Sequence, residues 1–222
     1  MDFKENPQLD VFKSELTKGA EFSSKNEFPI LERVDFKPTK AVPFCEAAGE
    51  KIKKNKWVHF YTDDYRFESV WNNPENYLRF LKLFGGVITP DYSLYRDLPF
   101  AIQVWNTYRN RVLAYWLQSN SVNIVPNIRW GDERTYDFAF EGIAQGGTVA
   151  VSTNGCIQDK RDRYYFKQGL DEMVRVLKPD TIVCYSYCPD DIFGEYKDSG
   201  TVEIIHIENH WETVRDKRKA VK

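Results

Sequence analysis

Short apolar runs alternate with polar segments along most of the chain after Pro29. Each run is rich in β-branched and aromatic residues and is bounded by residues that favour turns, a pattern that predicts β-strands. These runs predict strands at residues 41–45, 57–62, 86–89, 122–128, 148–153, 181–187 and 202–207.

Apolar positions at helical spacing lie between most of these runs. At Asn73 a capping side chain is followed by Pro74 in the first turn and by the carboxylate of Glu75, and a pair of glycines follows about three turns later. These start and stop signals predict a helix over residues 73–84. The same spacing predicts further helices at residues 97–116, 132–143 and 162–177.

Alternating strands and helices predict an α/β fold of successive βα units with a mainly parallel sheet. Two arrangements remain open: a barrel-like one, such as an incomplete TIM-type barrel, and an open doubly wound sheet. Polar residues occupy similar places at every strand end, which favours the barrel, and no Gly-x-Gly-x-x-Gly fingerprint supports dinucleotide binding. Residues 1–28 are predicted to form a polar N-terminal arm, and residues 29–222 a single α/β domain.

The composition is that of an ordinary globular protein, with 42% hydrophobic and 29% charged residues. The net charge of −2 lacks the positive excess that is usual for proteins that bind duplex nucleic acid. Aromatic residues reach 15%, which suits either a large core or a ring-lined binding face.

The chain contains no apolar run of the roughly 18 residues that a membrane span requires, and no signal peptide is evident at its start. Cys45, Cys156, Cys184 and Cys188 are too sparse for a disulfide scaffold, so we interpret them as reduced thiols. These features predict a cytoplasmic protein without a membrane partner.

Polar side chains follow the predicted strands, and the carboxyl ends of parallel strands meet at one edge where ligands bind. If the alternating faces of the strands share one cavity, two histidines, several carboxylates and an arginine converge there. Such a set could bind a divalent metal or carry out acid–base chemistry. The candidate catalytic residues are Asp63, Asp91, Arg129 and Glu208, and the candidate metal ligands are His59, Asp63, Asp91, His206 and Glu208. The alternative is that the histidines are core residues and the carboxylates cap helices.

A second group of polar and aromatic residues could recognise an anion or a planar ring. These candidate binding residues are Tyr92, Tyr95, Arg96, Trp105, Arg109, Asn127, Ser152 and Asn154. The alternative for the helical members is a half-buried helix whose arginines pair with Asp91 or Asp97. The loop that begins at Ser152 could present backbone N–H groups to a phosphate, or could be a plain turn.

Several segments resemble those of a known protein family that is found in bacteria and phages. The longest are residues 89–99 and 103–111, and residues 60–65, 71–74 and 149–155 are also similar. The family is domain of unknown function 4417, which occurs in Gram-positive bacteria, their phages and mobile elements. The similarity covers about residues 29–210. The resemblance implies an accessory protein of a phage or mobile element, and it implies no activity, cofactor or catalytic residue.

Three functions therefore remain open. The first is the binding of a host or phage protein, which agrees with the many aromatic side chains and the absence of a recognisable catalytic motif. The second is a metal-dependent enzyme that acts on a phosphorylated or nucleotide-like substrate at the strand ends. The third is nucleic-acid binding, which the net charge disfavours.

Overall fold

The computed structural model describes residues 12–209 and residue 212. Seven strands and six α-helices occur within them, joined by short 3-10 turns. The strands are β1 (Ala41–Pro43), β2 (Trp57–His59), β3 (Gly86–Ile88), β4 (Ile124–Val125), β5 (Thr148–Ser152), β6 (Thr181–Tyr185) and β7 (Glu203–Ile207). The helices are α1 (Glu68–Asn72), α2 (Glu75–Leu81), α3 (Phe100–Ser119), α4 (Tyr136–Ala139), α5 (Lys160–Leu177) and α6 (Asp190–Ser199).

All the strand pairs are parallel, and the strands follow one another in chain order. β1 to β4 form one sheet and β5 to β7 another, and a parallel bridge between Asn127 and Ala150 joins them. A doubly wound sheet would reverse its strand order at a switch point, and this sheet does not. The α/β prediction is therefore confirmed, and the sequential order selects the barrel-like arrangement over the doubly wound one.

The sheet curls so that side chains from distant strands meet inside it. The ring centroids of His59 on β2 and Tyr185 on β6 are 4.1 Å apart, although three strands separate them in the order. Among the described residues, no hydrogen-bonded pairing joins β7 to β1, so the barrel is incomplete. Its interior cluster draws a side chain from every strand: Ala41, Trp57, Ile88, Val125, Ala150, Val183 and Ile207.

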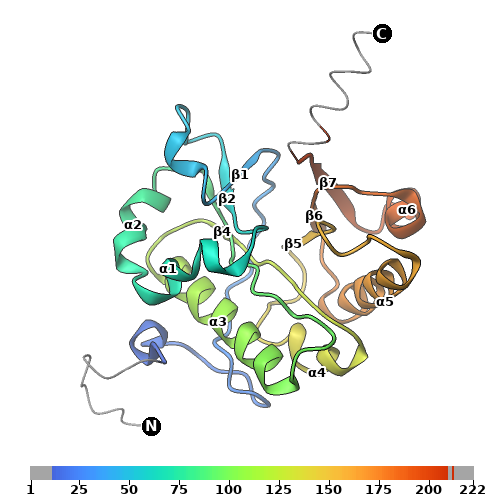
Figure 1. The fold of residues 1–222 in the computed structure, drawn as a ribbon, viewed down its shortest axis with the longest axis horizontal. Helices are drawn as coiled ribbons and strands as arrows, with labels where there is room; N and C mark the ends of the chain where they lie inside the picture. Colours follow the sequence, from blue (N-terminus) through green and yellow to red (C-terminus); the bar gives the residue numbers. More distant parts are fainter. Residues whose placement is uncertain (1–11, 210–211, 213–222) are drawn as a thin grey trace.

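Helices cover the outside of the barrel in two groups (Figure 1). Val58, Val87 and Ile124 alternate with the interior positions and pack in one core cluster with residues of α3. A second cluster joins the outer faces of β5 and β6 to α5 and α6. The alternation along each strand thus separates an interior core from two outer ones.

Each of the seven predicted runs contains a strand, and α2, α3 and α5 lie within or close to the predicted helices. The predicted helix at 132–143 is shorter, because only a 3-10 turn (Glu133–Thr135) and the four residues of α4 are helical. The helices α1 and α6 were not predicted from the sequence. In α6 two aspartates in the first turn and Gly200, with φ 63°, at the C-terminus are ordinary helix signals.

The described part of the predicted N-terminal arm packs on the domain. Leu16 and Phe28 are buried, and a 3-10 turn (Ser14–Thr17) lies against α3. The side chain of Asn26 and the backbone of Lys25 donate hydrogen bonds to the Glu141 carboxylate. Residues 12–28 are thus attached along α3 and to the segment that follows α4.

No helix among the described residues combines the length and the apolar character needed to cross a membrane.

Candidate functional site

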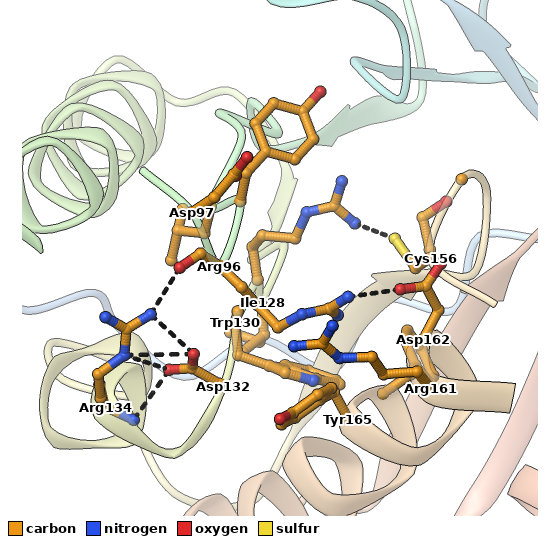
Figure 2. Close-up of a pocket in the computed structure, with 17 residues that line it drawn as sticks. Arg96, Asp97, Ile128, Trp130, Asp132, Arg134, Cys156, Arg161, Asp162 and Tyr165 are labelled. Carbon is orange, nitrogen blue, oxygen red and sulfur yellow. Dashed lines mark hydrogen bonds and ion pairs between the residues drawn. The ribbon is translucent and has the colours of Figure 1, made fainter. Parts of the chain in front are cut away.

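A pocket of about 570 Å³ opens at the carboxyl ends of β4 and β5. Its wall is formed by residues 94–97, by the segments that follow β4 and β5, and by the first turns of α5 (Figure 2). The volume lies within the roughly 300–1,000 Å³ that is typical of small-molecule sites. The pocket is therefore large enough for an organic ligand, at the edge where parallel α/β folds bind theirs.

Arginine supplies all the cationic side chains of the pocket. Arg96, Arg129, Arg134 and Arg161 line it, and none of the described lysines does, although lysines outnumber arginines in the chain. The planar guanidinium fork matches the oxygens of phosphate and carboxylate groups better than an ammonium does. Three aspartates also line the pocket, so the four arginines leave the wall with a small positive excess that favours an anionic ligand.

Two of these arginines lie together over one aromatic ring. The guanidinium carbons of Arg96 and Arg161 are 4.6 and 5.8 Å from the ring centroid of Tyr165. Arg96 Nη2 also donates a hydrogen bond of 2.6 Å to Asp162 Oδ1. Within the described residues Arg161 has no hydrogen-bond or carboxylate partner, so its donors are available to a ligand.

Arg134 is held at the opposite wall (Figure 2). Its Nη2 donates to Asp132 Oδ2 at 2.8 Å and to the carbonyl oxygen of Arg96 at 2.6 Å. The hydrogen bonds from Arg134 lower the pKa of Asp132. Asp132 therefore stays ionised and orients Arg134, and the hydrogen bond from Arg134 to the Arg96 carbonyl joins the loop after β4 to the segment that contains Arg96.

The fourth arginine connects the pocket to a polar chain inside the barrel. Arg129 Nη2 lies 3.3 Å from Asp91 Oδ2, and Nη1 donates to Cys156 Sγ at 2.6 Å. Asn127 Nδ2 donates to Asp91 Oδ1 at 2.8 Å, and Tyr61 Oη donates to Asn127 Oδ1 at 3.0 Å. Because hydrogen-bonded neighbours hold Arg129 on its inner side, its guanidinium has a fixed position in the wall.

Burial is the largest single influence on the pKa values of Asp91, Arg129 and Cys156. Burial raises the pKa of Asp91, and Arg129 and the Asn127 hydrogen bond oppose that rise. Burial alone would lower the pKa of Arg129, yet Asp91 and Cys156 raise it above its usual value. Burial also raises the pKa of Cys156, so its thiol is held protonated despite the adjacent arginine. Arg129 therefore stays cationic at neutral pH.

The apolar part of the pocket wall depends on a glycine. Trp130 and Phe166 line the pocket and are largely buried. Gly169 on α5 lies directly behind Trp130, since a Cβ at this position would come within 2.1 Å of Trp130 Nε1. Because Gly169 has no side chain, the Trp130 indole can pack closely against α5.

We expect Gly169→Ala to displace Trp130 and to lower the free energy of unfolding by about 1–3 kcal/mol, because overpacking outweighs the gain in helix propensity. Thermal and urea unfolding, with tryptophan fluorescence as a second readout, measure both effects. The matched control is Gly194→Ala in α6, where a Cβ would meet nothing closer than 3.5 Å. We expect that control to be neutral or slightly stabilised, and equal behaviour of the two variants would contradict the packing account.

The structure brings several of the predicted residues together. Tyr95, Arg96, Arg129 and Ser152 line the pocket, and Asp91 and Asn127 lie directly behind Arg129. Asn154 is exposed and lies outside the wall, with its Nδ2 3.5 Å from the Tyr61 carbonyl oxygen.

Other candidates lie elsewhere. Asp63 is exposed and lies 3.4 Å from Arg66 Nε, and Glu208, just after β7, does not line the pocket. The interior face of β7 carries Ile205 and Ile207, so His206 points to the other side, where its Nε2 lies 3.3 Å from Glu212 Oε1. The expectation that the His206 face shares the cavity is therefore wrong.

The five candidate metal ligands do not converge. His59 is enclosed in the barrel interior, Asp91 is paired with Arg129, and Asp63, His206 and Glu208 come from separate loops or faces. Across residues 12–209 and residue 212, no group of three or more His, Cys, Asp and Glu side chains is placed to hold a metal ion.

The α3 candidates form a structural cluster, not part of the pocket. Arg109 Nη1 donates to both carboxylate oxygens of Glu68 at 2.9 Å, and its guanidinium carbon lies 3.9 Å from the Tyr92 ring centroid. Trp105 packs edge-on against Trp71. The interpretation as a half-buried helix fits, but the expected partner was wrong: Glu68 pairs with Arg109, not Asp91 or Asp97.

Much of the pocket wall was not predicted from the sequence. Arg134, Arg161, Asp162 and Tyr165 belong to the turns and helices that follow β4 and β5. A signal for them exists, because the first turn of a helix that follows a parallel strand faces the same edge as the strand end. Arg161 and Tyr165 also have the i, i+4 spacing of neighbours on one helix face.

Comparison with known proteins supports the resemblance that the motifs suggested. The family model described as "Domain of unknown function (DUF4417)" matches residues 20–208, which begins within the predicted arm. The chain is 38% identical over 205 residues to the Gene 1 protein of Mycobacterium phage D29, covering 87% of this chain and 73% of the relative. It is 36% identical over 200 residues to the Gene 1 protein of Mycobacterium phage L5, covering 87% and 86%. No solved structure matches. The chain therefore belongs to the family described as Domain of unknown function (DUF4417), which has members in phages.

Proposed function

We propose that this protein binds a phosphorylated or nucleotide-like small molecule in the arginine-lined pocket at the carboxyl end of the barrel. The observation that carries the proposal is the convergence of four arginines on one cavity of about 570 Å³. The phage origin of the relatives supports action in the cytoplasm of a bacterial host.

The arrangement of the arginines favours a phosphoryl group over a simple counter-ion. Arg96 and Arg161 share the ring of Tyr165, so two cationic forks lie side by side. Asp162 neutralises Arg96 alone, at 2.6 Å. Like charges this close repel each other, and an anion placed between them relieves that repulsion. Hydrogen bonds between charged partners are also stronger than neutral ones.

The metal-dependent form of the hypothesis has less support. The proposed ligand class is that of the sequence-based alternative, but the described residues offer no gathered set of metal-binding side chains. We therefore propose binding through arginine and assign no reaction.

Substitution of the pocket arginines tests this function. We expect Arg161→Gln and Arg96→Gln each to weaken the binding of inorganic pyrophosphate about tenfold or more, because each removes a charged hydrogen bond worth roughly 1.5–3 kcal/mol. Isothermal titration calorimetry at constant ionic strength measures the dissociation constants. The matched control is Arg79→Gln, on an exposed position of α2 outside the pocket. Absence of pyrophosphate binding by the native chain, or equal affinities of all three variants, would contradict the proposal.

A second proposal, the binding of a host or phage protein, rests on a different observation. Tyr95, Phe100 and Ile102 are 61%, 49% and 44% exposed and lie close together in the chain, at the pocket rim and the start of α3. Exposed aromatic side chains of this kind anchor many interfaces. A Tyr95→Ser/Phe100→Ser double variant that loses a co-purifying partner, but keeps pyrophosphate affinity, would support this proposal over the first.

A further inference from the structure

Two charged side chains of the pocket have no partner among the described residues. Asp97 and Arg161 both line the cavity at solvent-exposed positions, and neither takes part in a hydrogen bond or an ion pair there. The other charged groups of the wall have carboxylate or guanidinium partners: Arg96 pairs with Asp162, Arg134 with Asp132, and Arg129 with Asp91 behind the wall. The pocket thus presents one unmatched cation and one unmatched anion to whatever it binds.

These two groups face the cavity from different sides. Arg161 and Arg96 lie together over Tyr165, on the side of α5, whereas Asp97 lies beyond Arg96 on the segment that leads into α3 (Figure 2). The wall between them includes apolar side chains such as Ile128 and Trp130 (Figure 2). A complementary ligand therefore has an anionic end, an apolar body, and N–H donors at the other end.

We propose that the pocket takes a guanine nucleotide, with its phosphate at Arg161 and Arg96 and its base at Asp97. This inference rests on the proposed function, since it names the ligand of the same pocket. Guanine presents two adjacent N–H donors, N1–H and the N2 amino group, which match the two oxygens of a carboxylate. Adenine and cytosine place a ring-nitrogen acceptor beside their amino group, and that lone pair would face a carboxylate oxygen. The flat purine ring accounts for the apolar wall.

Three nucleotides that differ by single groups test the assignment. Inosine monophosphate keeps N1–H but lacks the N2 amino group, and adenosine monophosphate lacks both donors. We expect the native chain to bind guanosine monophosphate about tenfold more tightly than inosine monophosphate, and inosine monophosphate more tightly than adenosine monophosphate, because each change removes a hydrogen bond to a charged carboxylate. Calorimetric titration of the native chain gives the three dissociation constants.

Substitution of Asp97 separates the base from the phosphate. We expect Asp97→Asn to remove the preference for guanosine monophosphate without weakening the binding of inorganic pyrophosphate, because the substitution removes a negative charge from the pocket. The matched control is Asp198→Asn, an exposed position of α6 outside the pocket, which should keep the native order.

The outcomes distinguish this inference from the proposed function. Equal affinities of the native chain for guanosine and adenosine monophosphates, together with pyrophosphate binding that depends on Arg161, would overturn the guanine assignment and leave the phosphate site standing. A guanine preference that persists in Asp97→Asn would also overturn the role of Asp97. Failure of the native chain to bind any of these phosphates would overturn both proposals together.

Discussion

Replacing Arg111 by methionine is expected to lower the free energy of unfolding by about 3–5 kcal/mol. Arg111 on α3 is 1% exposed, and its Nε and Nη2 donate hydrogen bonds of 2.8 and 2.6 Å to the carbonyl oxygens of Glu141 and Ala139. Ala139 is the last residue of α4, so Arg111 satisfies carbonyls that the end of this short helix leaves without partners. Methionine fills the space but leaves buried acceptors unpaired, at about 1–3 kcal/mol each.

Urea unfolding followed by circular dichroism measures this loss. Burial lowers the pKa of Arg111 to about 9, against the raising effect of Glu141, so the guanidinium is still cationic at neutral pH. The matched control is Arg79→Met on exposed α2, where we expect a change of no more than about 0.5 kcal/mol. If Arg111→Met were as stable as that control, Arg111 would not be holding the end of α4 in place.

The second large effect concerns the pH dependence of stability. His59 is 1% exposed in the barrel interior, its Nε2 has no hydrogen-bond partner in the described part of the chain, and burial lowers its pKa to about 3 from 6.5. The unfolded chain takes up a proton at His59 below pH 6.5, whereas the folded chain does so only near pH 3. Stability must therefore fall as the pH falls through this window, by about 1.4 kcal/mol per pH unit and about 5 kcal/mol in total.

We expect His59→Phe to remove this contribution and to flatten the dependence of unfolding free energy on pH between 6.5 and 3. Phenylalanine retains a ring in contact with Tyr185, but loses the hydrogen bond that His59 Nδ1 accepts from the Tyr61 N–H. The stability of the variant at neutral pH is therefore lower by about 1 kcal/mol or more, and the slope with pH is the readout. Carboxylates titrate alike in both chains, so parallel slopes would show that His59 is not a buried neutral base.

The strands could be predicted from the sequence because each one is a continuous apolar run. In a barrel covered by helices, both faces of a strand are buried, as in β5, where all five residues from Thr148 to Ser152 are buried. Such runs locate strands but do not reveal which face points inward. That is why His206 was placed on the cavity side, although Ile205 and Ile207 point inward on β7.

The candidate site was only partly predictable, for a related reason. Arg129, Ser152 and Asp91 follow strands directly, so strand position identified them. Arg161 and Asp162 come from the first turns of α5, and their meeting with Arg96 depends on how the loop before α3 packs. That packing is tertiary. The ion pair of Arg109 also depends on tertiary structure. Its partner Glu68 is 41 residues away in the chain, on a helix that no sequence pattern predicted.

The alkylation rate of Cys156 reports whether phosphoryl groups occupy the arginine-lined pocket. Cys156 lines the pocket beside Arg129, whereas Cys45 is exposed outside it and serves as an internal reference in the same sample. Iodoacetamide labelling of the two cysteines is followed by peptide mass spectrometry, with and without millimolar pyrophosphate at matched ionic strength. If the arginine-lined pocket binds phosphoryl groups, pyrophosphate slows the labelling of Cys156 in the native chain, leaves Cys45 unchanged, and protects Cys156 in Arg161→Gln only at higher concentrations. Identical labelling rates of Cys156 with and without pyrophosphate would contradict the account.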